Sequence, residues 1–548
     1  MAVALVGTVL SNADAATGWS GVTNIDTDSE VQGTGCLGTK VSNATTNATY
    51  ATTQDLSAGG SNPDYHIVMW LHCLTPTLAN QSAGGFRITV TDTTSTKEYY
   101  VGGLDNRKAG WGAYVVSPRI ASDVNGTPVS ASITSIGGTV STNATIMGNF
   151  NNGLWDQLTI GEGLRWTSTG GTFADFVTAD EGTVNNRYGW LSTTANGSIL
   201  LPQCRFYIGD GSTSTTFTDT AVLMVFEPAS GVATSSTVDA DFFGIIVTAA
   251  ASMSLSGNSF ISASNVNSKW SLNVQTSTSA SSFINSTFDR AAAITLASNT
   301  TFTGMTVTNS GSITTNGTTL TNCNIIDQTA PVILSSNLNE LSGCSFTHSS
   351  DTPGHAVNLG TVSSTTTMTW DCNLSSNTSG DWTGSPGTNV GGTSTDAAIT
   401  VNVAASQTLT ISVASGATVP TVRNTGTGQV DVVAGQTTIT ITVFDGTSTP
   451  AAITDLSARV YLVADANDAT AGITAGDVLI NALTDSQGRA SFTAGLSADL
   501  PVSGWVRRAT SSFGALPSGT TFFSQGLLNA TMSSASNTSV STILQPDE

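Results

Sequence analysis

Apolar residues recur at a regular interval in the middle of the chain. Three successive segments begin at Phe302, Leu320 and Leu341, which are 18 and then 21 residues apart. Each has apolar residues at its first, fourth and sixth positions, as in Leu320, Cys323 and Ile325. A spacing of two is typical of a strand, and recurrence of the whole pattern indicates stacked coils. The pattern therefore predicts a β-solenoid. An up-and-down antiparallel sheet is the alternative, but it would not restore the same register at each restart.

Alternation of apolar and polar residues elsewhere predicts an all-β protein with three parts. We expect a jelly-roll-like β-sandwich in residues 1–152, and a capping region followed by the β-solenoid (a parallel β-helix) in residues 153–435. We expect a small β domain in residues 436–548. Its turn at residues 484–489 and the apolar strands on either side resemble those of Ig-like or prealbumin-like modules. No segment has a convincing amphipathic helical pattern. A chain of 548 residues is also too long for a single hydrophobic core.

The first 15 residues contain an apolar run that imitates an export signal. No Lys or Arg precedes this run, and its alternation at Val3, Leu5, Gly7 and Val9 is typical of a strand. We therefore expect a strand rather than a signal. No later run approaches the length needed to span a bilayer, so no membrane insertion is expected.

Aromatic residues and cysteines add two expectations about the β-solenoid. An aromatic-rich run is predicted to cover its open end, where the core would otherwise be exposed. The residues are Trp155, Trp166, Phe173, Phe176, Tyr188 and Trp190. The six cysteines contain no C-x-x-C pair, which argues against zinc. Cys323 and Cys344 occupy the same place in successive segments, and we expect buried free thiols there rather than a disulfide.

The composition excludes several classes of partner. Charged residues make up only 10% of the chain, against about 25% in an average protein. The net charge of −21 opposes binding to nucleic acid through phosphate neutralisation, and it opposes docking on anionic membranes. A hydroxyl- and amide-rich surface on a stacked sheet favours a durable structural role, and we expect no cofactor.

A few residues in the coils are candidates for catalysis. Asp327 and Asp351 follow the strand parts of successive segments, and His348 and His355 flank Asp351. Enzymes that cleave polysaccharides use paired carboxylates, and a His–Asp–His group offers acid–base or metal chemistry. The alternative is that these are solvated turn residues, which we favour, so we assign no catalytic residue.

Aromatic residues in the first 152 residues are candidates for glycan contact. The strand order Tyr65–Cys73, Gly84–Val90, Tyr99–Gly103 and Gly110–Val116 resembles the jelly roll of concanavalin-like and carbohydrate-binding modules. The candidate residues are Trp70, Tyr99, Tyr100 and Trp111. In the alternative interpretation these rings fill the sandwich core or form cross-strand pairs.

One acidic turn near the end of the chain offers oxygen ligands. Asp465, Asn467 and Asp468 are candidates for a calcium site. The segment lacks the Gly and the terminal Glu of an EF-hand loop, and turns rich in Asp and Asn need no metal. We therefore expect a turn without bound metal.

Two parts of the chain resemble structural virion proteins of tailed bacteriophages, of the tail-fibre, tailspike or head-fibre type with a parallel β-helix. The first is MAVALVGTVLSNADAATGWSG at the start. The second comprises ARVYLVADA, GDVLINALTDSQG, PVSGWVRRATSS and ILQPDE near the end. The resemblance implies a protein that is assembled in the host cytoplasm and displayed on the particle. It implies other virion proteins and a host cell-surface glycan or protein as partners, and a homo-oligomer, usually a trimer.

The expected function is a non-enzymatic fibre or spike, on tail or capsid, that attaches the particle to its host. One alternative is an enzyme, a tailspike that cleaves surface polysaccharide as a glycoside hydrolase or lyase. Another is a capsid decoration protein that stabilises the shell. A bacterial adhesin is less favoured because an export signal is not evident.

Overall fold

The computed structural model describes most of the chain and shows a nearly all-β protein. It covers residues 2–544 except 23, 32, 58–64, 74–85, 94–95, 101–109, 117–131, 143–152, 182–189, 194–196, 202–203, 227–243, 263–269, 277–278, 336, 351–352, 377–381, 385–386, 389–394, 434, 446–451, 453–457, 469–470, 497, 509–524 and 535–536. The chain forms two compact units, Met1–Val332 and Ile333–Glu548.

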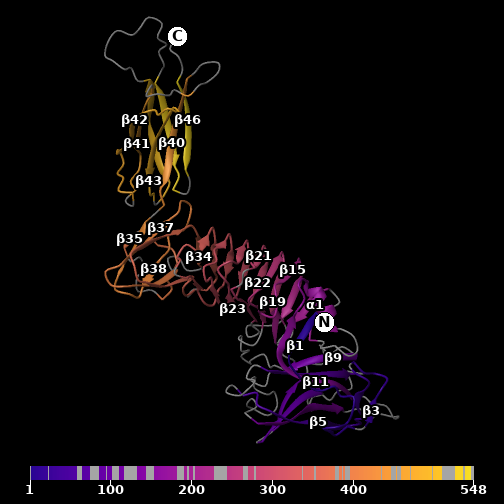
Figure 1. Cartoon of the computed structure of the whole chain (residues 1–548). Helices are drawn as coiled ribbons and strands as arrows, with labels where there is room; N and C mark the ends of the chain where they lie inside the picture. The colour runs from indigo at the N-terminus through magenta and orange to yellow at the C-terminus, as the bar shows by residue number, and fades with distance from the viewer. Residues whose placement is uncertain are drawn as a thin grey trace, which may run out of the picture. The chain divides into compact units, whose positions relative to one another are not determined.

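The first unit begins with a sandwich of two antiparallel sheets (Figure 1). One sheet has the order β3 (Asn24–Asp26), β4 (Cys36–Thr39), β11 (Gly153–Trp166), β6 (His66–Cys73) and β9 (Gly110–Val116). The other has the order β2 (Trp19–Ser20), β5 (Ala44–Gln54), β10 (Ile133–Thr142), β7 (Phe86–Asp92) and β8 (Thr96–Tyr100). Buried side chains such as Leu37, Ile67, Val90 and Ile136 form one core cluster in this sandwich. The predicted N-terminal sandwich is confirmed.

Strand β11 belongs both to this sandwich and to the coils that follow. Residues Gly153–Gly161 pair with β6 in the sandwich. Residues Gly163–Trp166 pair in parallel with β14 (Arg205–Ile208), the first strand of its coil sheet. The predicted N-terminal strand is β1 (Val3–Ser11), which pairs with β11 on the other side. The sandwich therefore continues into the coils through one uninterrupted strand.

The coils of the first unit form three parallel sheets (Figure 1). The first contains β15 (Thr215–Thr220), β18 (Ala251–Ser256), β21 (Ser282–Ile284), β24 (Thr301–Thr303) and β27 (Leu320–Thr321). The second contains β12 (Ser192–Thr193), β13 (Ile199–Leu201), β16 (Leu223–Phe226), β19 (Ser259–Ser262), β22 (Thr287–Asp289), β25 (Thr306–Thr308) and β28 (Asn324–Ile326), with β12 antiparallel. The third continues from β11 through β14, β17 (Gly244–Val247), β20 (Trp270–Val274), β23 (Ala291–Thr295) and β26 (Ser312–Thr314). Strand β29 (Val332–Ile333) lies at the unit boundary.

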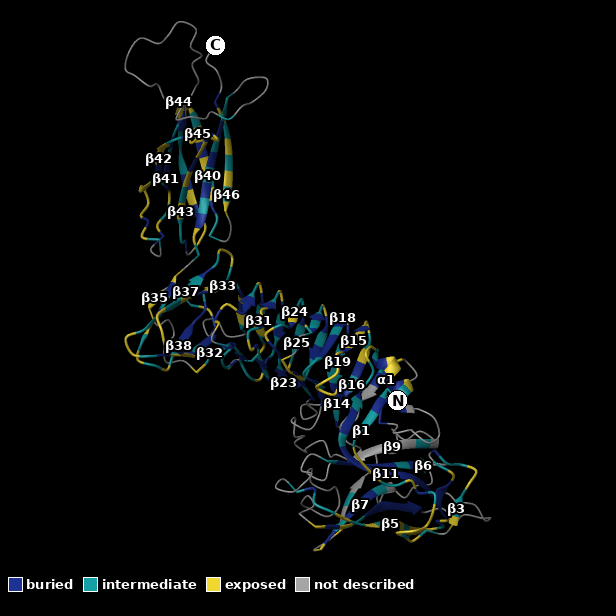
Figure 2. Ribbon diagram, in the orientation of Figure 1, coloured by how far each residue is buried: buried dark blue, intermediate teal, exposed yellow. Residues whose placement is uncertain are grey.

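The register of these sheets confirms the predicted parallel β-helix. Phe302 pairs with Leu320, and Val307 pairs with Ile325, one coil further on. Side chains at the repeated apolar positions are buried, Cys323 among them. Figure 2 shows these inward-facing positions alternating with more exposed ones along the coils. Each coil buries its apolar side chains against the next, as the spacing predicted.

The corners between strands explain much of the Asn and Gly content of the coils. Two columns of residues have a left-handed backbone with positive φ, namely Asn285, Gly304 and Asn322 in one and Arg290, Asn309 and Asp327 in the other. Asn and Gly adopt this conformation more readily than other residues. The backbone N–H of Asn285 donates to Thr303 at 3.0 Å, and that of Gly304 donates to Thr321 at 2.8 Å. Successive corners are therefore hydrogen-bonded to each other.

One helix, α1 (Phe173–Glu181), corrects the expectation that no amphipathic helix would be found. Thr172 begins it with a capping box, because its Oγ1 accepts from the N–H of Asp175 while the Asp175 carboxylate accepts from the N–H of Thr172. Asp219, on β15, accepts the N–H of Phe173 at 2.8 Å. Among the described residues, no helix has the length and the apolar character to cross a membrane.

This helix covers the first coil with aromatic side chains. Phe173 packs edge-on against Phe217 with ring centroids 4.8 Å apart, and Phe176 contacts both Trp166 and Phe206. Three of the predicted capping residues, Trp166, Phe173 and Phe176, thus cover the coil end. Of the others, Trp155 lies in the sandwich core and Trp190 is buried, while Tyr188 lies outside the described residues.

Parallel coils also form the first part of the second unit. Strand β31 (Ser345–His348), which follows β30 (Leu341–Ser342), pairs with β34 (Asn373–Ser376). Strands β32 (Val357–Val362), β36 (Ile399–Val403) and β38 (Val422–Asn424) form a second ladder. Strands β33 (Thr366–Trp370), β37 (Thr408–Val413) and β39 (Gln429–Val433) form a third, with β35 (Gly387–Thr388) antiparallel to β39. Parallel pairing thus extends to Val433, as predicted.

A second two-sheet sandwich follows the coils in the second unit. One sheet has the order β43 (Arg489–Ala494), β40 (Thr437–Asp445) and β46 (Thr538–Leu544). The other has the order β42 (Val478–Leu483), β41 (Ala458–Ala464), β44 (Leu500–Arg508) and β45 (Gly526–Met532). Buried residues such as Ile441, Val460 and Val506 form its core. This arrangement agrees with the predicted small Ig-like or prealbumin-like domain.

The cysteines that the structure describes are buried free thiols, as expected. Cys323 and Cys344 each lie between two strands of their own coil, and each is nearly or fully excluded from solvent. The thiol of Cys344 interacts with the thiol of Cys372 by a side-chain hydrogen bond. These two residues lie just before the paired residues Ser345 and Asn373 of β31 and β34. Cys344 and Cys372 therefore occupy neighbouring places in successive coils of the second unit.

Burial should make these thiols unreactive in the native protein. Burial raises the pKa of the Cys36 thiol to about 12, and it raises the pKa of the Cys204 thiol well above the usual range. The hydrogen bond with Cys344, followed by burial, raises the pKa of the Cys372 thiol well above the usual range. The thiolate that reacts with iodoacetamide is therefore scarce at pH 8. We expect slow labelling of Cys36, Cys204, Cys323, Cys344 and Cys372 in the native protein and rapid labelling after unfolding in guanidinium. Peptide mapping checks this, and native labelling as fast as in the unfolded protein would contradict it.

Candidate functional site

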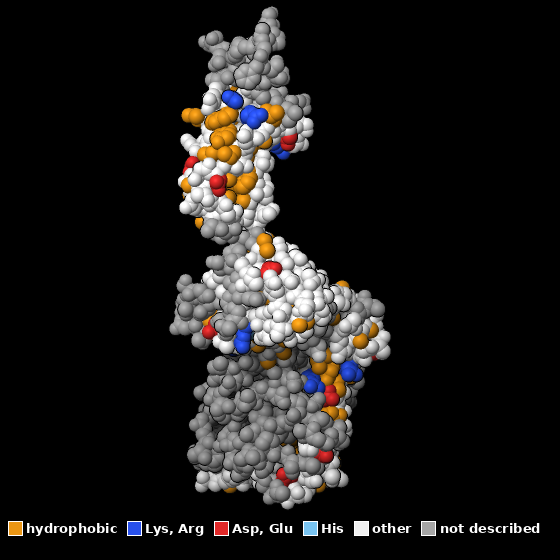
Figure 3. Space-filling model, turned by 90° about the vertical axis from the view of Figure 1, so that its left-hand side faces the viewer, with side chains coloured by type: hydrophobic (Ala, Val, Ile, Leu, Met, Phe, Trp, Pro, Cys, Tyr) orange, Lys and Arg blue, Asp and Glu red, His pale blue; other side chains and the backbone are white. Residues whose placement is uncertain are grey.

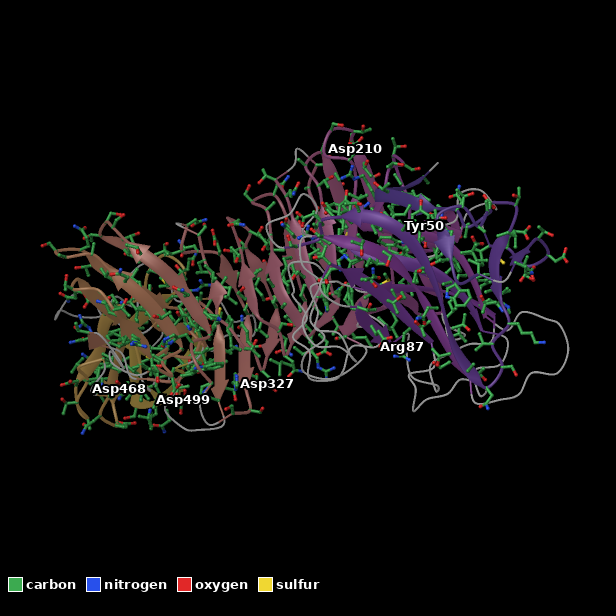
Figure 4. All side chains as sticks on the ribbon, turned by 90° about the horizontal axis from the view of Figure 1, so that it is seen from below. Tyr50, Arg87, Asp210, Asp327, Asp468 and Asp499 are labelled. Carbon is green, nitrogen blue, oxygen red and sulfur yellow. The ribbon has the colours of Figure 1, made fainter. Side chains whose placement is uncertain are left out.

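Three of the four catalytic candidates, Asp327, His348 and His355, lie in the described part of the chain. Asp327 occupies a left-handed corner after β28 (Figure 4). In the second unit, Nδ1 of His348 accepts from the N–H of Ser350 at 3.1 Å, and its ring lies edge-on to Trp382. Nδ1 of His355 lies 2.6 Å from the carbonyl oxygen of Ala397. Asp351 lies outside the described residues. Both histidines therefore contact backbone groups, and His348 also contacts an indole ring.

Other carboxylates of the coils connect neighbouring segments. Asp289 accepts hydrogen bonds from Thr308 at 2.8 Å and from Asn309 at 3.2 Å, one coil further on. In the second unit, Asp371 accepts from Ser342 at 3.1 Å. Within the described part of the chain, no group of three or more His, Cys, Asp or Glu residues is placed to hold a metal ion. These carboxylates therefore serve the stacking of the coils.

The four aromatic candidates of the N-terminal sandwich lie in two different sheets. Trp70 on β6 and Trp111 on β9 share one face, since His72 pairs directly with Trp111. The indole N–H of Trp111 donates to the carbonyl of Ser29 at 2.7 Å, so the nearby loop partly covers this face. Burial lowers the pKa of His72, whose ring packs edge-on against Trp111.

Tyr99 and Tyr100 belong to the other sheet of this sandwich. They pair through β8 with Ile88 and Arg87 of β7. Their side chains lie outside the described residues. Because the tryptophans and tyrosines are on separate sheets, the fold does not gather the four candidates on one sheet face.

The calcium candidates direct their oxygens to the protein itself. Asp465 accepts from the hydroxyl of Ser503 at 2.7 Å, and Asn467 accepts from the N–H of Ala475 at 2.8 Å. Asp468 is buried and accepts from the N–H of Ala471 at 3.0 Å (Figure 4). The bonds of Asn467 and Asp468 lie within the loop between β41 and β42, which is typical of a turn rich in Asp and Asn, and the bond of Asp465 joins this loop to β44.

An aromatic and basic surface that we did not predict lies on the C-terminal sandwich. Tyr461 on β41 and Trp505 on β44 pair directly and stack, with ring centroids 5.2 Å apart and ring planes 13° apart. The guanidinium of Arg507 lies 4.8 Å from the centre of the Trp505 ring. Leu527 on β45 pairs with Trp505 and is 79% exposed. Figure 3 shows hydrophobic and basic side chains gathered on this side of the domain. The alternation of apolar and polar residues within each strand indicates which side chains point outward. Which of these side chains are neighbours depends on the register between the strands, which the sequence does not give.

Comparisons with known proteins give little to set beside this geometry. No described protein family matches the chain, and no curated protein matches it. Among solved structures, the catalytic domain of a GH87 alpha-1,3-glucanase in complex with nigerose aligns with 75% of this chain and 81% of its own, at 9% identity and a TM-score of 0.16. A likeness this low carries no argument about fold or function. The chain is therefore assigned to no family on these grounds.

Proposed function

We propose that this chain is a non-enzymatic structural protein of a bacteriophage particle, a fibre or spike on the tail or capsid that attaches the particle to its host. The observation that carries the proposal is the shared strand β11, which pairs with β6 in the sandwich and with β14 in the coils. The six strands from β13 to β28 in one coil sheet span about 24 Å at about 4.8 Å per step. A sandwich built directly onto such a stack is a suitable support for holding a binding surface away from a particle.

The surface chemistry supports attachment through many weak contacts. The coils present hydroxyl and amide side chains, and only 10% of the whole chain is charged. Such groups form shallow hydrogen-bonding surfaces, and several copies on one particle would multiply a weak affinity. The partners in this proposal are other virion proteins and a host cell-surface glycan or protein, with a homo-oligomer, such as a trimer, as the assembled form.

The alternative functions make different demands on the structure. A tailspike that cleaves polysaccharide needs two carboxylates facing one bond in a groove. The carboxylates of Asp289 and Asp371 are instead bonded to neighbouring coil residues. We therefore favour attachment over hydrolysis, with capsid decoration as the remaining alternative.

Immunogold labelling of purified phage particles that encode this chain tests the proposal. We expect label on projecting fibres or spikes, and reduced adsorption to host cells when an antibody covers the protein. Absence of label from intact particles would contradict the proposal. Release of reducing ends from host polysaccharide by the purified chain would support the tailspike enzyme instead. A loss of capsid heat resistance without any change in adsorption would support decoration.

A further inference from the structure

The arginines of the C-terminal sandwich are concentrated on two neighbouring strands. Residues 436–548 contain four arginines, no lysine and nine acidic residues. Three of the four arginines, Arg459, Arg507 and Arg508, lie on β41 and β44. In a chain with a net charge of −21, this is a local concentration of positive charge. A concentration of this kind needs a structural or functional reason.

Two of these arginines, Arg459 and Arg507, face each other across neighbouring strands. Arg459 and Arg507 are direct cross-strand partners on the outer face of the sheet. Like charges in this position are destabilising. Among the described residues, neither forms an ion pair with a carboxylate. Asp465 directly follows β41, and its carboxylate accepts from the hydroxyl of Ser503, two pairs further along than the Tyr461–Trp505 pair. In the described part of the chain, these two positive charges therefore lie together without a carboxylate partner.

Each guanidinium is held by a neutral neighbour. Arg459 donates to the side-chain oxygen of Asn481 at 2.8 Å. Arg507 lies over the ring of Trp505, which in turn stacks on Tyr461. A guanidinium that uses its flat face for an aromatic ring keeps its N–H edges available for a carboxylate. The ring faces of Trp505 are already engaged, so the aromatic pair acts as a rigid support for the charge.

We propose that this arginine face (Arg459, Tyr461, Trp505, Arg507 and Leu527) binds an acidic polysaccharide. The two guanidinium groups would bind the carboxylates of successive sugar acids by charge-assisted hydrogen bonds. The exposed side chain of Leu527, 79% accessible beside Trp505, would contact the C–H surface of a sugar ring. The inference rests on the proposed function, because it names the class of host-surface ligand that the attachment protein would bind.

Charge complementarity selects this ligand over other occupants of the face. A second copy docked on the same face by a two-fold axis would bring arginines against arginines. A nucleic acid or an anionic membrane presents a large surface that the overall charge of −21 would repel. An acidic polysaccharide is a narrow chain, and it can contact one sheet face while most of the protein stays distant.

Binding of the purified full-length chain to polygalacturonate, with neutral dextran as the comparison, tests this site by affinity electrophoresis. We expect the wild type to be retarded by polygalacturonate alone, and more strongly at low salt. The double variant R459Q/R507Q should lose at least about tenfold in affinity, as expected for lost hydrogen bonds to charged groups. The variant W505A keeps both charges but should also bind more weakly, because Arg507 loses its support. The matched control R489Q removes one charge on β43 of the other sheet and should bind as the wild type does.

Several outcomes would overturn the site. They are no binding of the wild type to polygalacturonate, equal binding to dextran, or a loss in R489Q as large as that in R459Q/R507Q. Sedimentation that shows a wild-type oligomer dissociated by R459Q/R507Q would make the face a contact between copies. Thermal unfolding of each variant verifies that the domain is intact. Particle labelling is independent of this result, so labelled particles together with absent binding would overturn the site and leave the proposed function standing.

Discussion

Replacing Trp270 by alanine should lower the stability of the first unit's β-helix by about 3–5 kcal/mol, the usual cost of removing a fully buried aromatic side chain. Trp270 is completely excluded from solvent and stacks on Phe226 with ring centroids 4.7 Å apart. It also contacts Phe260 of its own coil and Phe288 of the next coil. Its indole N–H donates to the backbone carbonyl of Asp289 at 2.9 Å. Alanine has no such donor, so this carbonyl would lose the hydrogen bond. The cavity would lie between coils that cannot easily close it.

Hydrogen exchange measured by mass spectrometry locates this effect. Peptides from residues 251–326 should lose protection in Trp270→Ala, while those of the C-terminal sandwich should not change. Trp505→Ala is the matched control, since it removes the same side chain from a half-buried surface position. Unchanged protection of the coils in Trp270→Ala would show that the aromatic stack does not hold them together.

Replacing Gly311 by alanine should destabilise the same coils by about 1–3 kcal/mol or more, because it overpacks a close contact between backbones. Gly311 is buried and directly precedes β26. A Cβ atom added there would lie 1.9 Å from the carbonyl oxygen of Ala292 on the preceding coil. The N–H of Gly311 also donates to Ala291 at 2.7 Å, which fixes the separation of the two backbones. The coils would have to move apart to admit a methyl group.

Gly170→Ala provides the control for this substitution. Gly170 is exposed, and a Cβ atom there would lie no closer than 3.9 Å to its nearest neighbour, the carbonyl oxygen of Thr216. We expect it to have nearly wild-type stability. The midpoint of thermal unfolding compares the two variants, and equal midpoints would contradict the close approach of the coils at Gly311.

The coils could be predicted from the sequence because their signal is local and repeated. Burial of Leu320, Cys323 and Ile325 follows from spacing alone, and each coil repeats the same requirement. The corners carry a weaker signal. Asn, Gly and Asp suit a positive φ, but Arg290 occupies an equivalent corner, and nothing in its residue type points to this conformation.

Helix α1 could not be predicted with the same ease because its stability comes from outside its own sequence. A helix of nine residues is too short to be stable alone. It is fixed by Asp219 at its N-terminus and by the packing of Phe173 and Phe176 on the first coil. In the sequence these rings indicated an aromatic cap, and only the tertiary contacts reveal that the cap is helical.

The arginine face was missed for a reason of register. Tyr461 and Trp505 are separated in the chain by two strands and three connecting segments, and their stacking depends on which residue of β44 faces which residue of β41. A shift of one residue would turn Trp505 toward the core. The candidate residues of the N-terminal sandwich illustrate the same limit, because residues of one type were placed on different sheets.

Strand β11 has a mechanical consequence. Domains are usually joined by linkers that bend under load, whereas here Gly153–Trp166 is hydrogen-bonded along both of its halves. Tension along this strand would act on several parallel hydrogen bonds in shear, so they would have to break together rather than be peeled apart singly. A force applied to the coils would thus be transmitted directly to the sandwich, and the connection between them would be rigid and would not act as a hinge.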